Sequence, residues 1–400
     1  MSCLGGLRAK LGSAWKAGVA LAALVVVAGA PNATYAQGKK AELKVGFIAA
    51  LSGPGMSWGM GMLGGLELAA EDVNKAGGVV VGDTTYTIKV IAYDDKYAGP
   101  PAAQAAQRLV SQDEVKVIFG PLGSVSMLAI ADTTESNKVL VLSNSYTMKA
   151  LSKDKPYTFR LTPTTAENSD PMVAFIAKDL PDAKTVAIIS PNDESGKEVQ
   201  SHSEPAYQKY GLKVISKEFY ERGTQDFVPV LTRIMAQNPA ILDLDGSTPV
   251  DSGVIMKQAR QIGFKGKFVK VGGPGVADSI KIAGPAAEDL YYYSPWNPEE
   301  PKTKALTDRF EAKYKIPMNG LGIFFYEGAH MLFATMKQTK SVDTDVLRKA
   351  LESQKEYMGL QGRYVWGGAK AYGINHQWIA PFFVGQVRKG AEVMRTKIEP

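Results

Sequence analysis

The strongest constraint on the fold is a repeated alternation of short apolar segments with amphipathic ones. Leu43–Leu51 (LKVGFIAAL) is a nearly continuous apolar run, and after a turn Leu66, Ala69, Ala70 and Val73 follow at the i, i+3, i+4, i+7 spacing of one helix face. Apolar strands joined by amphipathic crossovers are typical of a parallel sheet covered by helices on both faces. The sequence therefore predicts an α/β fold.

The alternation continues in two series. At roughly 150 residues per domain, a 400-residue chain is expected to form two or three domains. The first series predicts strands at 43–51, 85–93, 115–119 and 139–142, with helices at 101–111 and 124–135. The second predicts helices at 167–179, 197–210, 227–236 and 250–262, with strands at 185–190, 213–217, 240–244 and 267–271. Helices near 304–314 and 324–340 are expected to return to the first sheet, and 379–387 to form a terminal strand of the second lobe.

The chain therefore divides into two expected lobes with more than one connection between them. Residues 41–160 with 293–372 are expected to form lobe 1, and residues 161–292 with 373–400 lobe 2. Two such lobes would leave a cleft between them, at the carboxyl ends of the strands.

The first 36 residues have the order of a secretory signal peptide. Arg8, Lys10 and Lys16 precede the uncharged stretch Ala17–Ala30, and Thr34-Tyr35-Ala36 places small residues before an expected cut after Ala36. The alternative is a membrane anchor. Fourteen helical residues, however, span about 21 Å, which is short of a hydrocarbon core about 30 Å thick.

The single cysteine, Cys3, precedes the apolar stretch instead of following it. A lipid anchor would need the cysteine after that stretch, so none is expected. The mature chain would have no thiol for a disulfide, a nucleophile or a metal site. An exported chain of this kind suits the periplasm of a Gram-negative bacterium.

The charge of the chain argues against a nucleic-acid partner. The formal charge is +6, and removal of the three leader cations would leave +3, with no long basic run. Nucleic-acid binders usually present a basic stripe.

Motifs for cofactor or metal chemistry are weak. Gly59–Gly64 matches G-x-G-x-x-G, but Gly59 lies eight residues beyond Leu51, whereas a dinucleotide site needs it at the strand end. Close helix packing is the alternative that we favour for Gly61, Gly64 and Gly65. The histidines at positions 202, 330 and 376 have no second ligand at metal spacing. We expect no cofactor and no metal.

No catalytic residue is nominated either. The chain has no G-x-S-x-G elbow and no phosphate-binding Gly-x-x-x-x-Gly-Lys-Ser/Thr loop. Asp94-Asp95 reads more simply as a strand end followed by a turn than as a catalytic pair. The chain is expected not to be an enzyme.

Several stretches resemble the type I periplasmic solute-binding proteins of ABC transporters, in the branched-chain amino-acid-binding (leucine-binding protein-like) family. They are Leu51–Pro54 with Trp58-Gly59, Leu68–Gly78 (LAAEDVNKAGG), Asp94-Asp95, Val117–Ser124, Ser143–Thr147, Gly223–Val228, Gln258–Arg260 before Gly263, and Ile282–Leu290. The resemblance covers nearly all of residues 43–395. It implies two Rossmann-like βα lobes, joined by a multi-strand hinge, that close on a small ligand.

The resemblance also implies where the carboxylate of a ligand would bind. The matching positions are Ser124, with Leu122 and Gly123 beside it, and Ser145-Tyr146-Thr147. Backbone N–H groups at a helix N-terminus together with a hydroxyl form an anion site without a buried cation. The alternative for Ser124 is a plain helix N-cap. Trp58 matches an aromatic position that faces the apolar part of the ligand, and a core tryptophan is its alternative.

The chain departs from the family where an amino group would bind. Amino-acid binders place a tyrosine on the first lobe-two loop and an acid on a later one. The matching positions are Ser195 and the loop around Gly273, which has no carboxylate. Asp245 is the possible substitute, or else it caps the next loop. Tyr97 and Gly123 stand where some members have a disulfide.

An ammonium buried without a carboxylate partner loses its compensation for desolvation. The ligand is therefore expected to be a carboxylic acid without an α-amino group, with branched-chain amino acids and amides as alternatives. The expected partner is the ABC permease in the inner membrane, and the chain is expected to be a monomer. An exported sensory module that signals through a membrane partner is the rival hypothesis.

Overall fold

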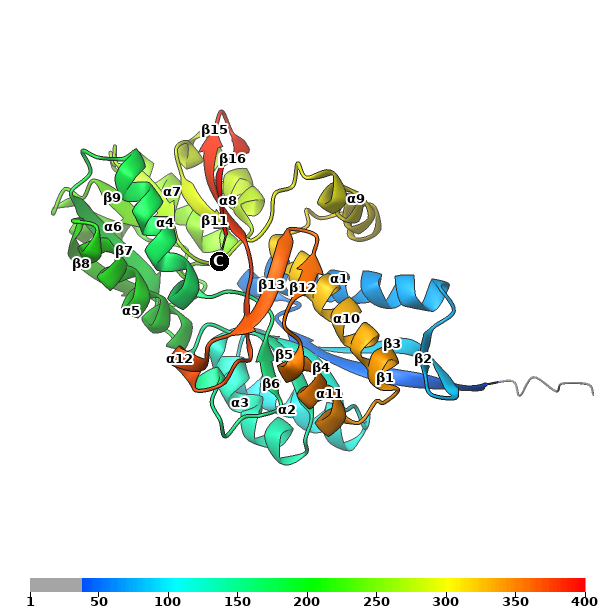
Figure 1. Cartoon of the computed structure of the whole chain (residues 1–400). Helices are drawn as coiled ribbons and strands as arrows, with labels where there is room; N and C mark the ends of the chain where they lie inside the picture. Colours follow the sequence, from blue (N-terminus) through cyan, green and yellow to red (C-terminus); the bar gives the residue numbers. More distant parts are fainter. Residues whose placement is uncertain (1–37, 400) are drawn as a thin grey trace, which may run out of the picture. The chain divides into compact units, whose positions relative to one another are not determined.

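The apolar segments of the two series form the centres of two separate sheets. The computed structural model describes residues 38–399 (Figure 1). The predicted signal peptide, residues 1–36, lies outside the described residues. Both sheets combine a parallel centre with antiparallel strands at one edge or both. The predicted α/β fold is confirmed.

The first sheet has nine strands, six of which (β14, β6, β5, β4, β1 and β3) run parallel next to one another. β1 runs alongside β3 from the Lys39–Thr84 pair to the Ala49–Asp94 pair, and β4, β5 and β6 continue the parallel arrangement. In spatial order the strands are β12 (Tyr357–Gly359), β13 (Gly362–Gly367), β14 (Gln377–Ile379), β6 (Thr158–Arg160), β5 (Leu140–Asn144), β4 (Val117–Leu122), β1 (Lys39–Ala49), β3 (Thr84–Asp94) and β2 (Val79–Val81).

The second sheet has seven strands with a parallel centre. In spatial order they are β16 (Ala391–Ile398), β15 (Phe382–Arg388), β11 (Tyr291–Ser294), β10 (Lys267–Lys270), β9 (Ile241–Asp243), β7 (Thr185–Pro191) and β8 (Lys213–Tyr220). β15 pairs antiparallel with both β11 and β16, so the end of the chain closes one edge.

Helices cover both faces of each sheet. Along β1, Phe47 packs with α1 and α10 on one face, whereas Ile48 packs with α2 and α3 on the other. This alternation is the period of two that a strand imposes on its side chains. The helices are α1 (Met56–Lys75), α2 (Gly99–Ser111), α3 (Ser124–Ser136), α4 (Thr165–Asp179), α5 (Glu194–Lys209), α6 (Val228–Met235), α7 (Pro249–Gln261), α8 (Val276–Ala283), α9 (Pro301–Tyr314), α10 (Gly320–Thr339), α11 (Thr344–Ser353) and α12 (Ala369–Tyr372).

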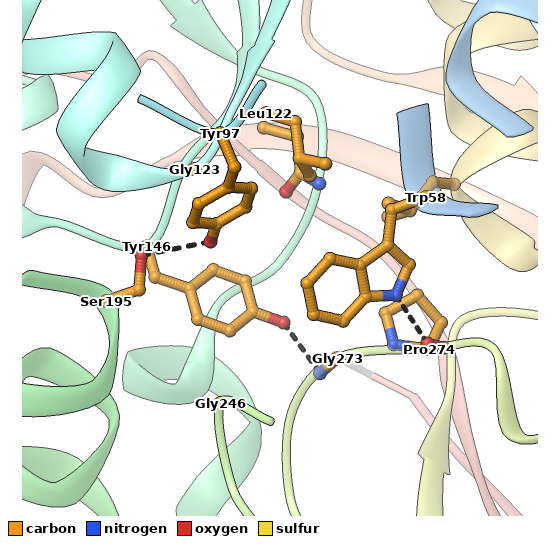
Figure 2. A pocket seen from close by; sticks show the side chains of 11 residues that line it. Trp58, Tyr97, Leu122, Gly123, Tyr146, Ser195, Gly246, Gly273 and Pro274 are labelled. Carbon is orange, nitrogen blue, oxygen red and sulfur yellow. Dashed lines mark hydrogen bonds between the residues drawn. The ribbon is translucent and has the colours of Figure 1, made fainter. Parts of the chain in front are cut away.

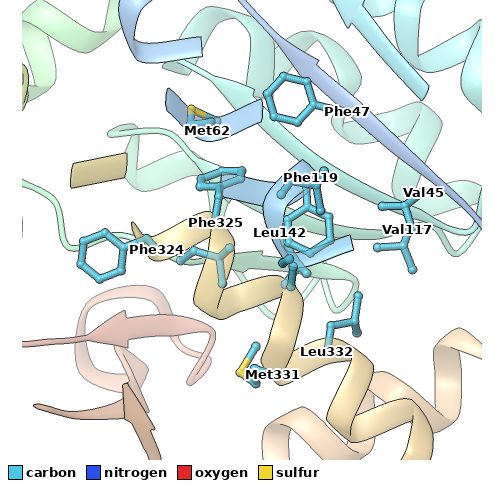
Figure 3. Close-up of a cluster of buried hydrophobic side chains, with 14 of the residues drawn as sticks. Val45, Phe47, Met62, Val117, Phe119, Leu142, Phe324, Phe325, Met331 and Leu332 are labelled. Carbon is cyan, nitrogen blue, oxygen red and sulfur yellow. The ribbon is translucent and has the colours of Figure 1, made fainter. Parts of the chain in front are cut away.

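Of the two late helices, α10 returns to the first sheet, as predicted, whereas α9 packs against α1. Phe324, Phe325 and Leu332 of α10 share a buried cluster with Phe47 of β1 and Phe119 of β4 (Figure 3). The rings of Phe47 and Phe325 meet edge to face, with their centroids 6.4 Å apart. A segment nearly 300 residues later in the chain thus completes the core that the first strand begins.

The glycines of α1 allow neighbouring elements to approach closely. A Cβ at Gly61 would lie 2.3 Å from Asn319 Nδ2, and one at Gly64 would lie 2.2 Å from the ring of Phe310. At Gly65 it would lie 2.1 Å from the carbonyl oxygen of α10 Gly322. The interpretation of these glycines as packing residues is confirmed.

The chain changes sheets at three places within the described residues. It does so after β6, after β11 and between β14 and β15 (Figure 1). The first two changes fall close to the expected boundaries at 160 and 292. The exact division of the residues between the two lobes stays a prediction.

Residues 379–387 do not form the expected single strand of the second lobe but are divided between two strands in different sheets. Gln377–Ile379 pair with β13 and β6 of the first sheet, and only Phe382–Arg388 belong to the second sheet. Pro381 stands at the break, and proline has no N–H to donate to a continuous ladder. The expected boundary at 373 therefore assigns one strand of the first sheet to the second lobe.

Candidate functional site

A cavity lies where loops from the two sheets meet. About 380 Å³ of empty space lies between its walls, including the open solvent at its mouth (Figure 2). Most of the loops that line it follow the carboxyl ends of strands β3, β4, β5, β9 and β10, which is where α/β sheets usually bind ligands. The lining residues are Trp58, Tyr97, Leu122, Gly123, Asn144, Tyr146, Ser195, Gly246, Gly273, Pro274 and Leu321.

Aromatic side chains from the first-sheet side reach the backbone of the opposite loop. Trp58, in the first turn of α1, donates from Nε1 to the carbonyl oxygen of Pro274 at 2.6 Å. The N–H of Gly273 donates to the hydroxyl of Tyr146 at 2.9 Å. Figure 2 shows both bonds at the same loop. The two sides of the cavity are therefore tied together by aromatic residues that also form its walls.

The loop that receives these bonds has little room for side chains. A Cβ at Gly272 would lie 2.8 Å from Thr165 Cγ2 and 2.9 Å from Asp245 Oδ1. At Gly273, where φ is +83°, it would lie 3.3 Å from Trp58 Cζ2. Glycine at these positions allows the loop to approach both the tryptophan and the buried carboxylate.

Three predicted residues form a hydrogen-bonded cluster beside the cavity, to which Ser124 and Ser195 contribute hydroxyls and Thr147 its backbone N–H. The hydroxyl of Ser195 donates to Ser124 Oγ at 2.9 Å, and the N–H of Thr147 donates to the same oxygen at 3.0 Å. The N–H of Ser124 faces Ser195 Oγ at 3.3 Å. Ser124 is thus a buried junction between the loop after β5, the start of α3 and the start of α5.

The capping alternative for Ser124 is wrong. The residue at the N-cap position of α3 is Gly123, and Ser124 is the first residue of the helix. Its hydroxyl accepts from Thr147 instead of capping its own helix. The backbone N–H of Ser124, at this helix start, donates to Ser195 Oγ, and the anion-binding role of the helix N-terminus stays a prediction.

The structure places the predicted site residues in two layers. Six of them line the cavity, and the other four are buried directly behind it. The lining residues are Trp58, Leu122, Gly123, Tyr146, Ser195 and Gly273, and the residues behind them are Ser124, Ser145, Thr147 and Asp245. The backbone carbonyl of Ser145 accepts from Nη1 of the buried Arg160 at 2.8 Å. Their roles in ligand binding stay predictions.

Asp245 lies behind the cavity wall. It is fully buried, and its Oδ2 accepts from the hydroxyl of Ser203 at 2.6 Å. Burial raises the pKa of Asp245 to about 6, against the effect of the Ser203 hydrogen bond, which favours the charged form. The carboxylate is therefore held by groups of its own lobe, with Gly272 between it and Tyr146.

Five lining residues were not predicted as site residues: Tyr97, Asn144, Gly246, Pro274 and Leu321. The ring of Tyr97 covers Gly123, where a Cβ would lie 2.7 Å from its Cζ, and the Arg222 guanidinium stands 4.5 Å from the ring centroid. Tyr97 follows β3, so the position of its strand end was a usable signal. Leu321 comes from α10, and nothing in the sequence connects it with the cleft.

Within residues 38–399, no three His, Cys, Asp or Glu side chains stand close enough to hold a metal ion. In the same part of the chain, no helix has the length and apolar character needed to cross a membrane.

Comparison with known proteins decides the family. The sequence profile described as "Periplasmic binding protein" matches residues 42–392, which is most of the chain. The chain belongs to the periplasmic binding protein family. A leucine-, isoleucine-, valine-, threonine- and alanine-binding protein of Pseudomonas aeruginosa is 26% identical over 314 residues, which is 78% of this chain and 82% of that protein. The expected family is confirmed.

Solved members of the periplasmic binding protein family share the fold. The branched-chain amino acid substrate-binding protein LivJ of Streptococcus pneumoniae, in complex with isoleucine, superposes with a TM-score of 0.78 at 20% identity, covering 90% of this chain and 100% of that one. A solute-binding protein of an ABC transporter from R. palustris, in complex with benzoate, gives 0.77 at 18% identity, covering 90% and 97%. Both an amino acid and an aromatic acid are thus bound on this fold.

Proposed function

We propose that the protein is the periplasmic solute-binding component of an ABC importer, and that it captures a small carboxylate between its two lobes by hinge closure. The main support is the convergence of the Ser124 and Ser195 hydroxyls, the N–H of Thr147 and a helix N-terminus beside a cavity walled by Trp58 and Tyr146. The protein would bind and release its ligand without making or breaking a covalent bond.

The carboxylate end of the ligand would lie against the start of α3. Backbone N–H groups there have no partner within the helix, and the helix dipole favours negative charge. In the structure the hydroxyl of Ser195 accepts from the N–H of Ser124 at 3.3 Å. A ligand carboxylate would take this bond and add the hydroxyls of the cluster, so Ser195 would contribute from the second lobe.

We infer that the ligand lacks an α-amino group. The loop 272–275 has glycine and proline where an acid would be needed, and Asp245 is committed to Ser203 behind the wall. The walls of the cavity offer two tyrosine rings and a tryptophan, which suit an aromatic or branched apolar body. An aromatic or aliphatic carboxylic acid satisfies both features.

Export, localisation and partners belong to the same proposal. The charged and apolar order of residues 1–36 supports a cleavable signal peptide and release into the periplasm. Delivery of the ligand would then require permease subunits in the inner membrane. These subunits would bind the closed form of the protein differently from its open form. A binding protein of this kind would need no cofactor and no catalytic residue.

The first test is a thermal-shift screen of the mature chain with branched-chain amino acids, their oxo acids, aromatic acids and amides. We expect carboxylic acids without an amino group to raise the melting temperature. Ser124→Ala combined with Ser195→Ala should weaken binding of the best acid at least about tenfold, because Ser195 lines the cavity and the hydroxyl of Ser124 holds the hydroxyl of Ser195 in place. Ser136→Ala, at the far end of α3, is the control and should leave the affinity unchanged. Stabilisation by no carboxylate would refute the proposal.

The role of Asp245 separates the two ligand classes. If the ligand is an acid without an amino group, Asp245→Asn should change its affinity less than about threefold, because asparagine still accepts from Ser203. If the ligand is an α-amino acid held by Asp245, the loss should exceed about tenfold. Titration calorimetry at pH 6 with the best ligand of the screen measures the difference. A loss above tenfold would contradict our inference on the ligand.

A further inference from the structure

Lys270 is a buried cation for which the fold provides no partner. It is the last residue of β10, and only 1% of its surface is exposed. Its Nζ has no hydrogen-bond partner among residues 38–399, and no carboxylate in that range lies within salt-bridge distance. A buried ammonium without a partner is costly, so such a group is usually retained for what it does.

The ammonium lies next to the cavity wall. Its Nζ is 5.8 Å from the centroid of the Trp58 ring, within the range of a cation–π contact. A Cβ at Gly273 would lie 3.4 Å from Lys270 Cε and 3.3 Å from Trp58 Cζ2. Trp58 and Gly273 both line the cavity. Only a glycine backbone and one face of the indole therefore separate the lysine stem from the cavity.

The carboxylates around Lys270 have other partners and lie beyond salt-bridge distance of its ammonium. Asp245 Oδ2 accepts from Ser203 at 2.6 Å, while its Oδ1 has no partner among residues 38–399, and Asp251 accepts from the hydroxyl of Tyr220 at 3.0 Å. Arg222 pairs with Asp193, and Asp278 acts on Lys270 only as a more distant charge. Burial lowers the pKa of Lys270 to about 7, although Asp245 and Asp251 oppose the shift. A small change in the neighbourhood would thus decide whether the lysine is charged near neutral pH.

We propose that Lys270 selects the group at the second-lobe end of the ligand, and that this group is a hydrogen-bond acceptor, most favourably an anion. The inference rests on the proposed function and extends it from the carboxylate to the group of the ligand that faces the second lobe. An acceptor gives the ammonium the partner that the fold withholds. A ligand ammonium would face a like charge across a loop that has no carboxylate.

The test compares two pairs of probes, each with a hydrogen-bond acceptor in one member and an ammonium in the other. Terephthalate and 4-(aminomethyl)benzoate form one pair, and 4-methyl-2-oxopentanoate and leucine form the other. In each pair we expect the wild type to bind the acceptor at least about tenfold tighter than the ammonium compound. In Lys270→Met the preference should fall to within about threefold. Lys267→Met, on the same strand with its ammonium paired to Asp289, is the matched control and should keep it.

A second measurement uses the wild type alone and does not depend on folding of the variant. A bound anion raises the pKa of a neighbouring lysine, so Lys270, largely neutral at pH 8 in the free protein, should take up a proton on binding terephthalate or the oxo acid. Calorimetry at pH 8 in two buffers of different ionisation enthalpy detects this uptake. Because Lys270 loses its proton as the pH rises through about 7, the affinity should fall between pH 6 and pH 9.

Three results would overturn the proposal: tighter binding of either ammonium probe by the wild type, an unchanged preference in Lys270→Met, or no binding of any of the four probes. If another carboxylate of the screen still stabilises the protein, only the selection by Lys270 fails. If none does, the proposed function fails with it.

Discussion

Replacing Trp58 by alanine should reduce the affinity for the best carboxylate of the screen by about a hundredfold or more. The indole forms one wall of the cavity, and its Nε1 donates to Pro274 across the cleft at 2.6 Å. Its ring also packs beside Tyr97, with their centroids 6.4 Å apart. The substitution removes an apolar wall of the site and a bond that holds the opposite loop in place, so ligand contact and cleft closure are lost together. Titration calorimetry gives the affinity.

Trp58→Phe is the matched control for this prediction. Phenylalanine keeps an aromatic wall and lacks only the N–H, so the loss should stay near tenfold, the value of one hydrogen bond. Melting both variants without ligand shows how much of the effect is on the fold. Equal affinities of Trp58→Ala and the wild type would show that the ligand does not reach this cavity.

The parallel centres of both sheets follow from local patterns. The run 185–190 lies within β7 (Thr185–Pro191), in which every residue after Thr185 is buried, as expected of an apolar strand between amphipathic helices. The run 85–93 lies within β3 (Thr84–Asp94), which is mostly half-buried. The strands that were missed, such as β12 (Tyr357–Gly359) and β16 (Ala391–Ile398), are edge strands with exposed faces. Their pairing depends on partners brought by tertiary structure, which a single sequence does not display.

The part of the site that backbone N–H groups and serine hydroxyls form was predictable from the sequence. Ser124 and Thr147 stand in order after two strands of one sheet, so their meeting follows from topology, and they meet in the structure. Ser195 joins them from the other lobe. The burial of Lys270 was not predictable, because it stands at the end of a strand whose pattern does not reveal which side chain turns toward the cleft.

The position of Asp245 shows the same limit. From the sequence, a carboxylate after a strand could serve a ligand or a loop with equal ease. The structure turns one of its oxygens to Ser203, 42 residues earlier in the chain, and places the glycine of position 272 in front of the other. Two contacts distant in sequence thus decide which of two locally equivalent roles the side chain can fill.

Gly65→Ala should have a large effect on stability. In a helix alanine is about 1 kcal/mol better than glycine, so the local effect alone would stabilise the protein. The added Cβ, however, would lie 2.1 Å from the carbonyl oxygen of Gly322 and 3.0 Å from its Cα. Both are backbone atoms of α10, so relief requires the helices to separate. We expect a net loss of about 3 kcal/mol in the free energy of unfolding, measured by denaturant titration.

Gly99→Ala is the control that isolates the helix contact. Gly99 is the first residue of α2, and a Cβ there would meet Val125 Cγ1 at 3.4 Å and Ala129 Cβ at 3.5 Å, which is ordinary contact. The same chemical change should therefore leave stability within about 1 kcal/mol of the wild type. Because α1 also bears Trp58 in its first turn, displacing the helix at Gly65 should weaken ligand binding as well, whereas Gly99→Ala should not. Equal unfolding energies for the two variants would mean that α1 and α10 do not pack through their glycines.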